Sequence, residues 1–95
     1  MKHYLYILWS DSKKKYYVGE THNIEERILK HQTHSYSNSY TKIANDWQLK
    51  LTFECDNRLG ALFLEKFIKK MKSIKFIEKI ILNPNILSDI LTKKK

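Results

Sequence analysis

The chain has 95 residues and a formal net charge of +8 at pH 7, with 42% hydrophobic and 13% aromatic residues. This length suits one domain with a modest core, and the composition excludes a disordered tail. No apolar run approaches the ~20 residues of a membrane helix, and no secretory cleavage pattern follows Met1, so we expect a soluble cytoplasmic protein without a membrane partner. The single cysteine, Cys55, excludes a disulfide framework and a thiolate zinc site.

The positive charge is concentrated in the last third of the chain. Residues 66–95 carry nine lysines against two acidic residues, whereas residues 1–65 carry nine basic against eight acidic residues. This density favours binding to nucleic-acid phosphates. An acidic membrane surface or a merely solvated helix face would also account for it.

Two β-rich runs lie near the start of the chain. Residues 3–10 and 15–20 are rich in aromatic and branched side chains, and the polar insert between them predicts a β-hairpin. The first run is apolar on both faces, which is typical of a central strand. A symmetric turn would place Tyr6 directly opposite Tyr17, so we expect the two phenols to be cross-strand neighbours on one face. A packed aromatic pair without a chemical role would give the same pattern.

A helix and then a third strand are expected next. Asn23 can cap a helix that runs to about residue 32, with Glu26 as the reciprocal half of a capping box. Residues 33–46 are predicted to form a polar loop. The alternation in residues 47–54 predicts a half-buried strand whose single apolar face is formed by Trp47, Leu49, Leu51 and Phe53.

Helical periodicity dominates the rest of the chain. Asp56 or Asn57 can cap a helix over about 58–72, Ser73 opens a shorter helix that ends at Asn83-Pro84-Asn85, and a last amphipathic turn runs from Ile86 to Leu91. The predicted class is α+β, a three-stranded antiparallel sheet flanked by helices, in the order ββαβαα plus a short C-terminal helix. Residues 1–82 are expected to form the domain, and residues 83–95 a short helix with a basic tail.

One face of the first helix carries polar residues toward the sheet. Ile24, Arg27, Ile28 and His31 stand at positions i, i+3, i+4 and i+7. Because the isoleucines mark the buried side, Arg27 and His31 enter a partly buried environment where an unpaired charge is costly. Arg27 could instead extend to the rim and pair with a carboxylate, with His31 satisfied locally.

A lone carboxylate, Glu65, lies at the border of the apolar face of the second helix. It could form an ion pair with Lys69 one turn on, worth only about 0.3–0.5 kcal/mol. It could also serve as a hard oxygen ligand for Mg²⁺, which keeps several waters and uses substrate phosphates as further ligands.

Five short motifs follow one another along the chain: Tyr4-Leu5-Tyr6, Tyr17-Val18-Gly19, Arg27 followed by His31, Tyr40-Thr41-Lys42, and Glu65 in a lysine-rich helix. In this order they resemble the GIY-YIG nuclease superfamily, and most of all its small single-domain bacterial members. The resemblance covers about residues 3–80, and the ordered set is specific where any one motif is not.

The resemblance implies an endonuclease that hydrolyses phosphodiester bonds in DNA with one Mg²⁺ or Mn²⁺ ion, in repair or recombination. Tyr17 would be the general base, Tyr6 would position the water, Arg27 would stabilise charge on the scissile phosphate, Glu65 would hold the metal, and His31 would assist proton movement or hold the phosphate. A free phenol is almost entirely protonated at pH 7, so a tyrosine base needs the guanidinium and the metal. The expected substrate contacts are Tyr40, Lys42, Lys69 and Lys72.

The chain departs from the family pattern at two places. The first motif lacks its glycine and isoleucine, and no asparagine occurs between Ile77 and Ile80, where many relatives carry one. Two other functions therefore stay open. One is a non-catalytic module that binds nucleic acid through its lysines, and the other is a domain that acts only with a partner protein supplying specificity.

Overall fold

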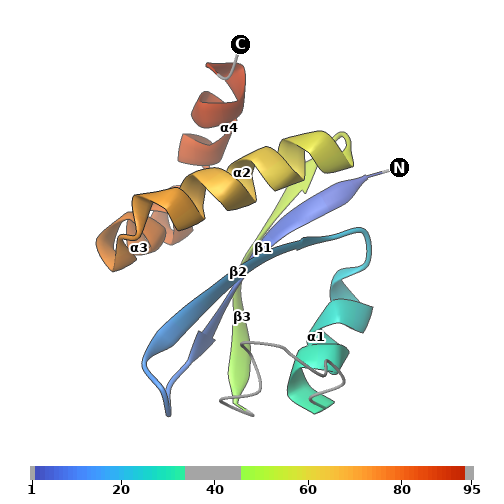
Figure 1. Ribbon diagram of the computed structural model, residues 1–95, viewed down its shortest axis with the longest axis vertical. Helices are drawn as coiled ribbons and strands as arrows, with labels where there is room; N and C mark the ends of the chain where they lie inside the picture. The colour runs from blue at the N-terminus through green and yellow to red at the C-terminus, as the bar shows by residue number, and fades with distance from the viewer. Residues whose placement is uncertain (1, 34–45, 94–95) are drawn as a thin grey trace.

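The computed structural model describes residues 2–33 and 46–93, which form a sheet flanked by helices (Figure 1). The elements in chain order are β1 (His3–Ser10), β2 (Lys15–Thr21), α1 (Ile24–Thr33), β3 (Trp47–Cys55), α2 (Arg58–Met71), α3 (Ile74–Leu82) and α4 (Asn85–Thr92). The predicted order and the α+β class are confirmed. No helix in the described ranges has the length and apolar character needed to span a bilayer.

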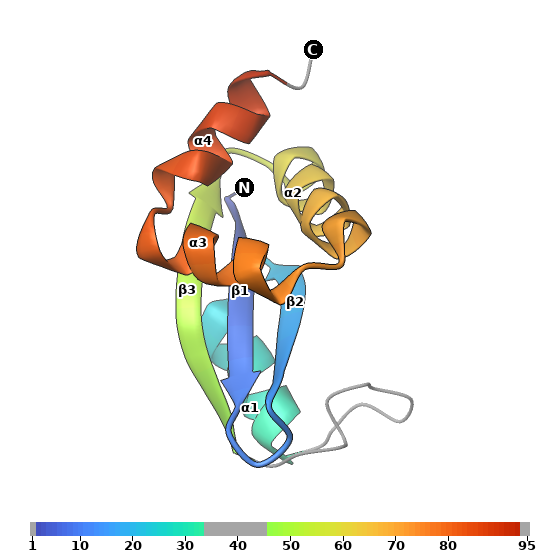
Figure 2. The same cartoon turned by 90° about the vertical axis from the view of Figure 1, so that its left-hand side faces the viewer.

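The strand β1 lies in the centre of the sheet, as its two apolar faces predict. The strand order is β2-β1-β3, and both pairings are antiparallel. The helix α1 covers one face of the sheet, and α2, α3 and α4 lie over the other (Figure 2). Because β2 is an edge strand, its outer side is open to neighbouring groups.

Side chains of β1 alternate between two apolar clusters. Leu5 and Ile7 belong to the larger cluster, which also contains buried side chains of α2, α3 and α4, Leu87 of α4 among them. Tyr6 and Leu8 belong to the smaller cluster, on the side of α1. The members of this smaller cluster are Tyr6, Leu8 and Trp47, with Tyr17, Ile24 and Ile28 packed against them.

The register of the β1–β2 hairpin differs from the predicted one. Tyr6 pairs with Gly19, and Leu8 pairs with Tyr17, so the expectation that Tyr6 lies directly opposite Tyr17 is wrong. Because the partner of Tyr6 is two positions further along β2, every side chain keeps its predicted face. Tyr6 and Tyr17 are therefore diagonal neighbours on one face, with ring centroids 6.1 Å apart.

A long turn causes this shift. Strand pairing ends at Ser10 and Lys15, so residues 11–14 form the turn, and Lys14 adopts a left-handed backbone with φ of 54°. The carboxylate of Asp46 holds the turn, because it accepts hydrogen bonds from the Ser10 hydroxyl at 2.6 Å and the Ser12 backbone N–H at 2.9 Å. The bond from Ser10 and then the bond from Ser12 hold the pKa of Asp46 below its ordinary value. Asp46 is remote in sequence, so the hairpin segment alone does not reveal this contact.

The predicted single apolar face of β3 is also wrong. A register irregularity in the middle of the β1–β3 pairing leaves Lys50 as an extra residue. Trp47 consequently packs in the smaller cluster beside α1, whereas Leu51 and Phe53 pack against the larger cluster on the opposite face. Leu49, on the Trp47 side of the bulge, is 43% exposed.

The predicted helix starts are confirmed by their caps. The side chains of Asn23, Asn57 and Ser73 each accept a hydrogen bond from the backbone N–H three residues further on. Of the two candidates before α2, Asn57 is the cap. Cys55 is a free, buried thiol, and burial raises its pKa.

Candidate active site

The Tyr6 ring occupies space that a side chain at position 19 would fill. A Cβ at position 19 would lie 2.6 Å from Tyr6 Oη and 3.0 Å from Tyr17 Cε2. Gly19 does not have a positive φ, so the close approach of the tyrosines and not backbone freedom calls for glycine here. Tyr6 itself has no solvent exposure, and its phenol is held against the β2 backbone.

Tyr17 is the more accessible of the two phenols. It is half-buried, while its ring lies 6.1 Å from the Tyr6 ring and 6.4 Å from Trp47, measured between centroids. The Lys69 ammonium lies 5.6 Å from the centroid of the Tyr17 ring. This is within the range of a cation–π contact. Tyr17 thus lies between the buried aromatic cluster and a cationic group of α2.

The helix α2 brings Glu65 to the same edge of the sheet. Lys69 Nζ lies 2.6 Å from Glu65 Oε2, and the Glu65 side chain is only 19% exposed. The predicted i,i+4 ion pair therefore exists. Through Lys69, the carboxylate of Glu65 is linked to the ring of Tyr17.

Arg27 is half-buried on α1. Ile24 and Ile28 pack against the smaller cluster, as their spacing predicts. Arg27 therefore belongs to the helix that covers the sheet face carrying Tyr6 and Tyr17. Three predicted residues cannot be placed with it, because they fall outside what the structure describes: the side chain of His31, and all of Tyr40 and Lys42.

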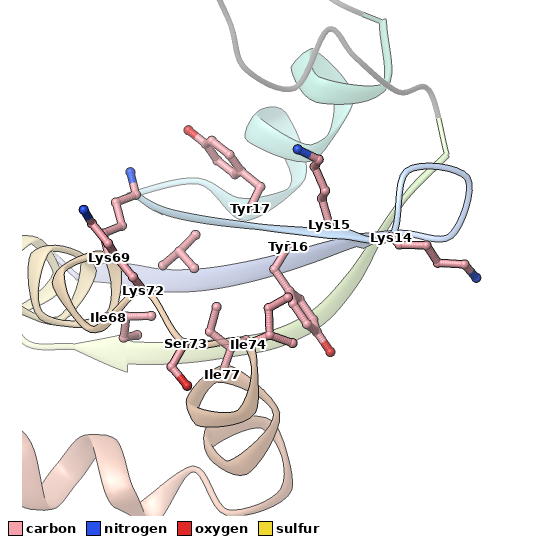
Figure 3. Close-up of a pocket in the computed structure, with 11 residues that line it drawn as sticks. Lys14, Lys15, Tyr16, Tyr17, Ile68, Lys69, Lys72, Ser73, Ile74 and Ile77 are labelled. Carbon is pink, nitrogen blue, oxygen red and sulfur yellow. The ribbon is translucent and has the colours of Figure 1, made fainter.

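A pocket of about 630 Å³ adjoins Tyr17 at the outer edge of β2 (Figure 3). Four lysines line it, and the prediction included Lys69 and Lys72 but missed Lys14 and Lys15. The signal for the missed pair is the run of three lysines in the hairpin turn, next to the second tyrosine motif.

The donors near Tyr17 fit one kind of metal ion. Within the described residues, no group of three or more histidine, cysteine or carboxylate side chains could hold a metal. A single half-buried carboxylate, Glu65, suits Mg²⁺, because this ion keeps several waters and takes further ligands from substrate phosphates. Lys69 would have to yield its bond to Glu65 when the ion binds.

The family model of the GIY-YIG catalytic domain matches residues 2–76. The chain belongs to the GIY-YIG family. A UPF0213 protein from Syntrophus aciditrophicus (strain SB) is 37% identical over 83 residues, which cover 87% of this chain and 94% of that protein. The solution NMR structure of a UPF0213 protein from Bacillus halodurans has a TM-score of 0.55 and 26% sequence identity, and the match covers 96% of this chain and 97% of the other.

Membership in the GIY-YIG family places the chain among nuclease domains, which generally use a divalent metal. The fold agrees, because the solved UPF0213 structure matches nearly the whole chain. In this GIY-YIG domain, β1 supplies Tyr6, β2 supplies Tyr17 and Gly19, and α2 supplies Glu65.

Proposed function

We propose that this GIY-YIG protein is a metal-dependent endonuclease that hydrolyses phosphodiester bonds in DNA. The observation that carries the proposal is the chain of contacts from the Glu65 carboxylate through Lys69 to the ring of Tyr17, beside the buried Tyr6. A phosphodiesterase needs a base for the attacking water, a cation beside the phosphate and a ligand for its metal. These side chains belong to the residue types that such a site requires. A role in DNA repair or recombination stays a prediction.

The different burial of the two tyrosines supports a different role for each. Tyr17 is the proposed base, because it is half-buried at the pocket and can reach a water beside a bound phosphate. Tyr6 has no exposed surface. In place of the expected positioning of the water, its proposed role is to hold Tyr17 and the Gly19 backbone in position. The ring of Tyr17 packs beside the rings of Tyr6 and Trp47, and these contacts support its orientation.

Positive charge beside Tyr17 supports the same reaction. Lys69 and Arg27 are the proposed cations that stabilise the negative charge developing on the scissile phosphate. Glu65 would hold Mg²⁺ or Mn²⁺. When bound, the ion supplies Lewis-acid stabilisation of the phosphate in the transition state. We propose that His31, Tyr40 and Lys42 also take part, in the roles that the family resemblance implies.

Nicking of supercoiled plasmid DNA tests the proposal. The wild-type protein is expected to nick in MgCl₂ and not in EDTA, and Glu65→Gln and Arg27→Ala are expected to lose about a hundredfold or more in rate. Glu54→Gln is the matched control, because Glu54 lies on β3, at the opposite edge of the sheet from β2. Equal nicking by all four proteins would show a contaminant and would overturn the assignment.

The alternative is a non-catalytic module that binds nucleic acid with its lysines. One observation favours it: the Glu65 carboxylate already has a cationic partner at 2.6 Å, as a purely structural ion pair would. This alternative predicts salt-sensitive binding without cleavage and without any response to Mg²⁺. A protein that binds plasmid DNA yet leaves it intact in MgCl₂ and in MnCl₂ would decide in its favour.

A further inference from the structure

The pocket beside Tyr17 has the size and position of a substrate subsite. Its volume of about 630 Å³ lies within the range of about 300–1,000 Å³ that is typical of small-ligand sites. It lies between the open edge of β2 and the junction of α2 with α3 (Figure 3). Tyr17 and Lys69 form one side of it, so the pocket is continuous with the candidate active site.

The walls of the pocket combine an apolar surface with an aromatic ring. Val18, Ile68 and Ile77 contribute apolar surface, and Ile74 is 57% exposed at the opening. Tyr16 lies on the opposite face of β2 from Tyr17, and its ring is 4.6 Å from that of Trp9, between centroids. Burial, and then the nearby Glu78, raise the pKa of Tyr16 above its ordinary value. Such a wall suits a flat, uncharged group such as a nucleobase.

Two lysines at the pocket have an unfavourable backbone conformation. Among the described residues, Lys14 and Lys72 are the non-glycine residues with positive φ, at 54° and 49°, and both line the pocket. A side chain with a Cβ is disfavoured in this region, and glycine or asparagine is the usual residue at such turns and helix ends. Backbone strain of this kind concentrates at functional sites. Lysine at both positions gives up stability, although the Lys14 ammonium lies 3.7 Å from Asp11 Oδ1 and points away from the pocket in Figure 3.

We propose that this pocket binds one unstacked nucleotide of a single nucleic-acid strand, next to the phosphate that is cut. The base contacts Tyr16 and Ile74, Lys72 binds one flanking phosphate, and Lys14 turns from Asp11 to bind the other. The choice of nucleic acid as the occupant rests on the proposed nuclease function and on the four lysines of the pocket. In a duplex the base is stacked and paired, so it enters such a pocket only after flipping, whereas a single strand presents it directly.

Binding without metal tests the pocket separately from cleavage. Fluorescence anisotropy in EDTA compares labelled oligothymidylate with a strand of the same length made of abasic sites and with a duplex of that length. We expect oligothymidylate to bind about tenfold more tightly than the abasic strand, since stacking on an aromatic side chain contributes that much per base. Binding by charge alone would instead favour the duplex, which has the higher charge density.

Equal affinity for the thymidylate and abasic strands would overturn the proposal, and so would tighter binding of the duplex. The open edge of β2 could also accept an extended peptide as an added strand. An acidic peptide that binds the protein and displaces oligothymidylate more strongly than free phosphate does would overturn the nucleotide assignment as well. The anisotropy assay measures binding and not cleavage. It can therefore refute the nucleotide pocket without refuting the nuclease function, and the plasmid assay can do the reverse.

Asparagine variants test the two strained lysines. Lys14→Asn with Lys72→Asn is expected to reduce the slope of log affinity against log salt by about one to two. The melting temperature should stay the same or rise, because asparagine tolerates the left-handed backbone better than lysine. The matched control is Lys50→Asn with Lys93→Asn, which removes the same charge from two exposed positions outside the pocket. An equal loss of slope in the control, or a fall in stability of the pocket variant alone, would contradict the assignment.

Discussion

The substitution Gly19→Ala tests the contact on which the candidate site is built. The added Cβ would lie 2.6 Å from Tyr6 Oη and 2.7 Å from Tyr6 Cζ, and the Tyr6 ring is fully buried and cannot turn away. Overpacking of this kind costs about 1–3 kcal/mol. The lower entropy of alanine in the unfolded chain offsets about 0.4–1 kcal/mol of that cost. The net loss of about 1 kcal/mol would lower the melting temperature by roughly 4–8 °C in a domain of this size.

The other glycine of the chain gives the control. An added Cβ at Gly60 would meet no atom closer than 3.6 Å, and Gly60 lies in α2, where alanine is favoured by up to about 1 kcal/mol. Gly60→Ala is therefore expected to raise the melting temperature in circular dichroism, while Gly19→Ala lowers it. A double-mutant cycle with Tyr6→Phe removes the shortest contact and should reveal a coupling of at least about 0.5 kcal/mol. Additive effects would refute the packing of Tyr6 against Gly19.

Two further predictions concern single contacts. Lys69→Met removes the ammonium at 2.6 Å from Glu65, so Mn²⁺ should bind the metal-free protein about two- to fivefold more tightly in isothermal titration calorimetry. Unchanged affinity would mean that Lys69 does not compete with the ion. Asp46→Asn should lower the melting temperature at pH 7, because the folded state holds the pKa of this carboxyl below its ordinary value of 3.8. The difference from wild type should shrink as the pH falls below 3.8, and a difference independent of pH would contradict this cause.

Local signals in the sequence predicted the elements well. Asn23, Asn57 and Ser73 cap helices where they were expected, because a side-chain acceptor before an apolar periodic run is a local cue. The period of two in the strands also fixed which face carries Tyr6 and Tyr17.

Contacts between distant residues account for the errors. Asp46 holds the hairpin turn, but it lies more than thirty residues beyond the hairpin. The burial pattern of β3 depends on a bulge against β1, which the sequence of β3 alone does not reveal. The positive φ of Lys14 and Lys72 is also invisible in the sequence, since the residue usual at such positions is glycine or asparagine. The sequence therefore does not predict that these two lysines line the same pocket.

The candidate site was predictable in part. The order of motifs predicted that Tyr6, Tyr17 and Glu65 belong to one site, because it matches a family. No periodicity links a strand of the hairpin to a helix some forty residues further along the chain. The link that the structure adds is Lys69, which contacts both Glu65 and the Tyr17 ring.

Adjacent tyrosines on opposite faces of β2 allow the most direct test of the central claim. Single-turnover cleavage of labelled DNA in MgCl₂ would compare Tyr17→Phe with Tyr16→Phe, each of which loses one hydroxyl and keeps its ring. If Tyr17 is the base beside Glu65, Tyr17→Phe should lower the rate by about a hundredfold or more. Tyr16→Phe keeps the ring that the nucleotide would contact, so its rate should fall by less than about fivefold. Equal rates for the two variants would contradict the assignment of the catalytic site to the face that carries Tyr6 and Tyr17.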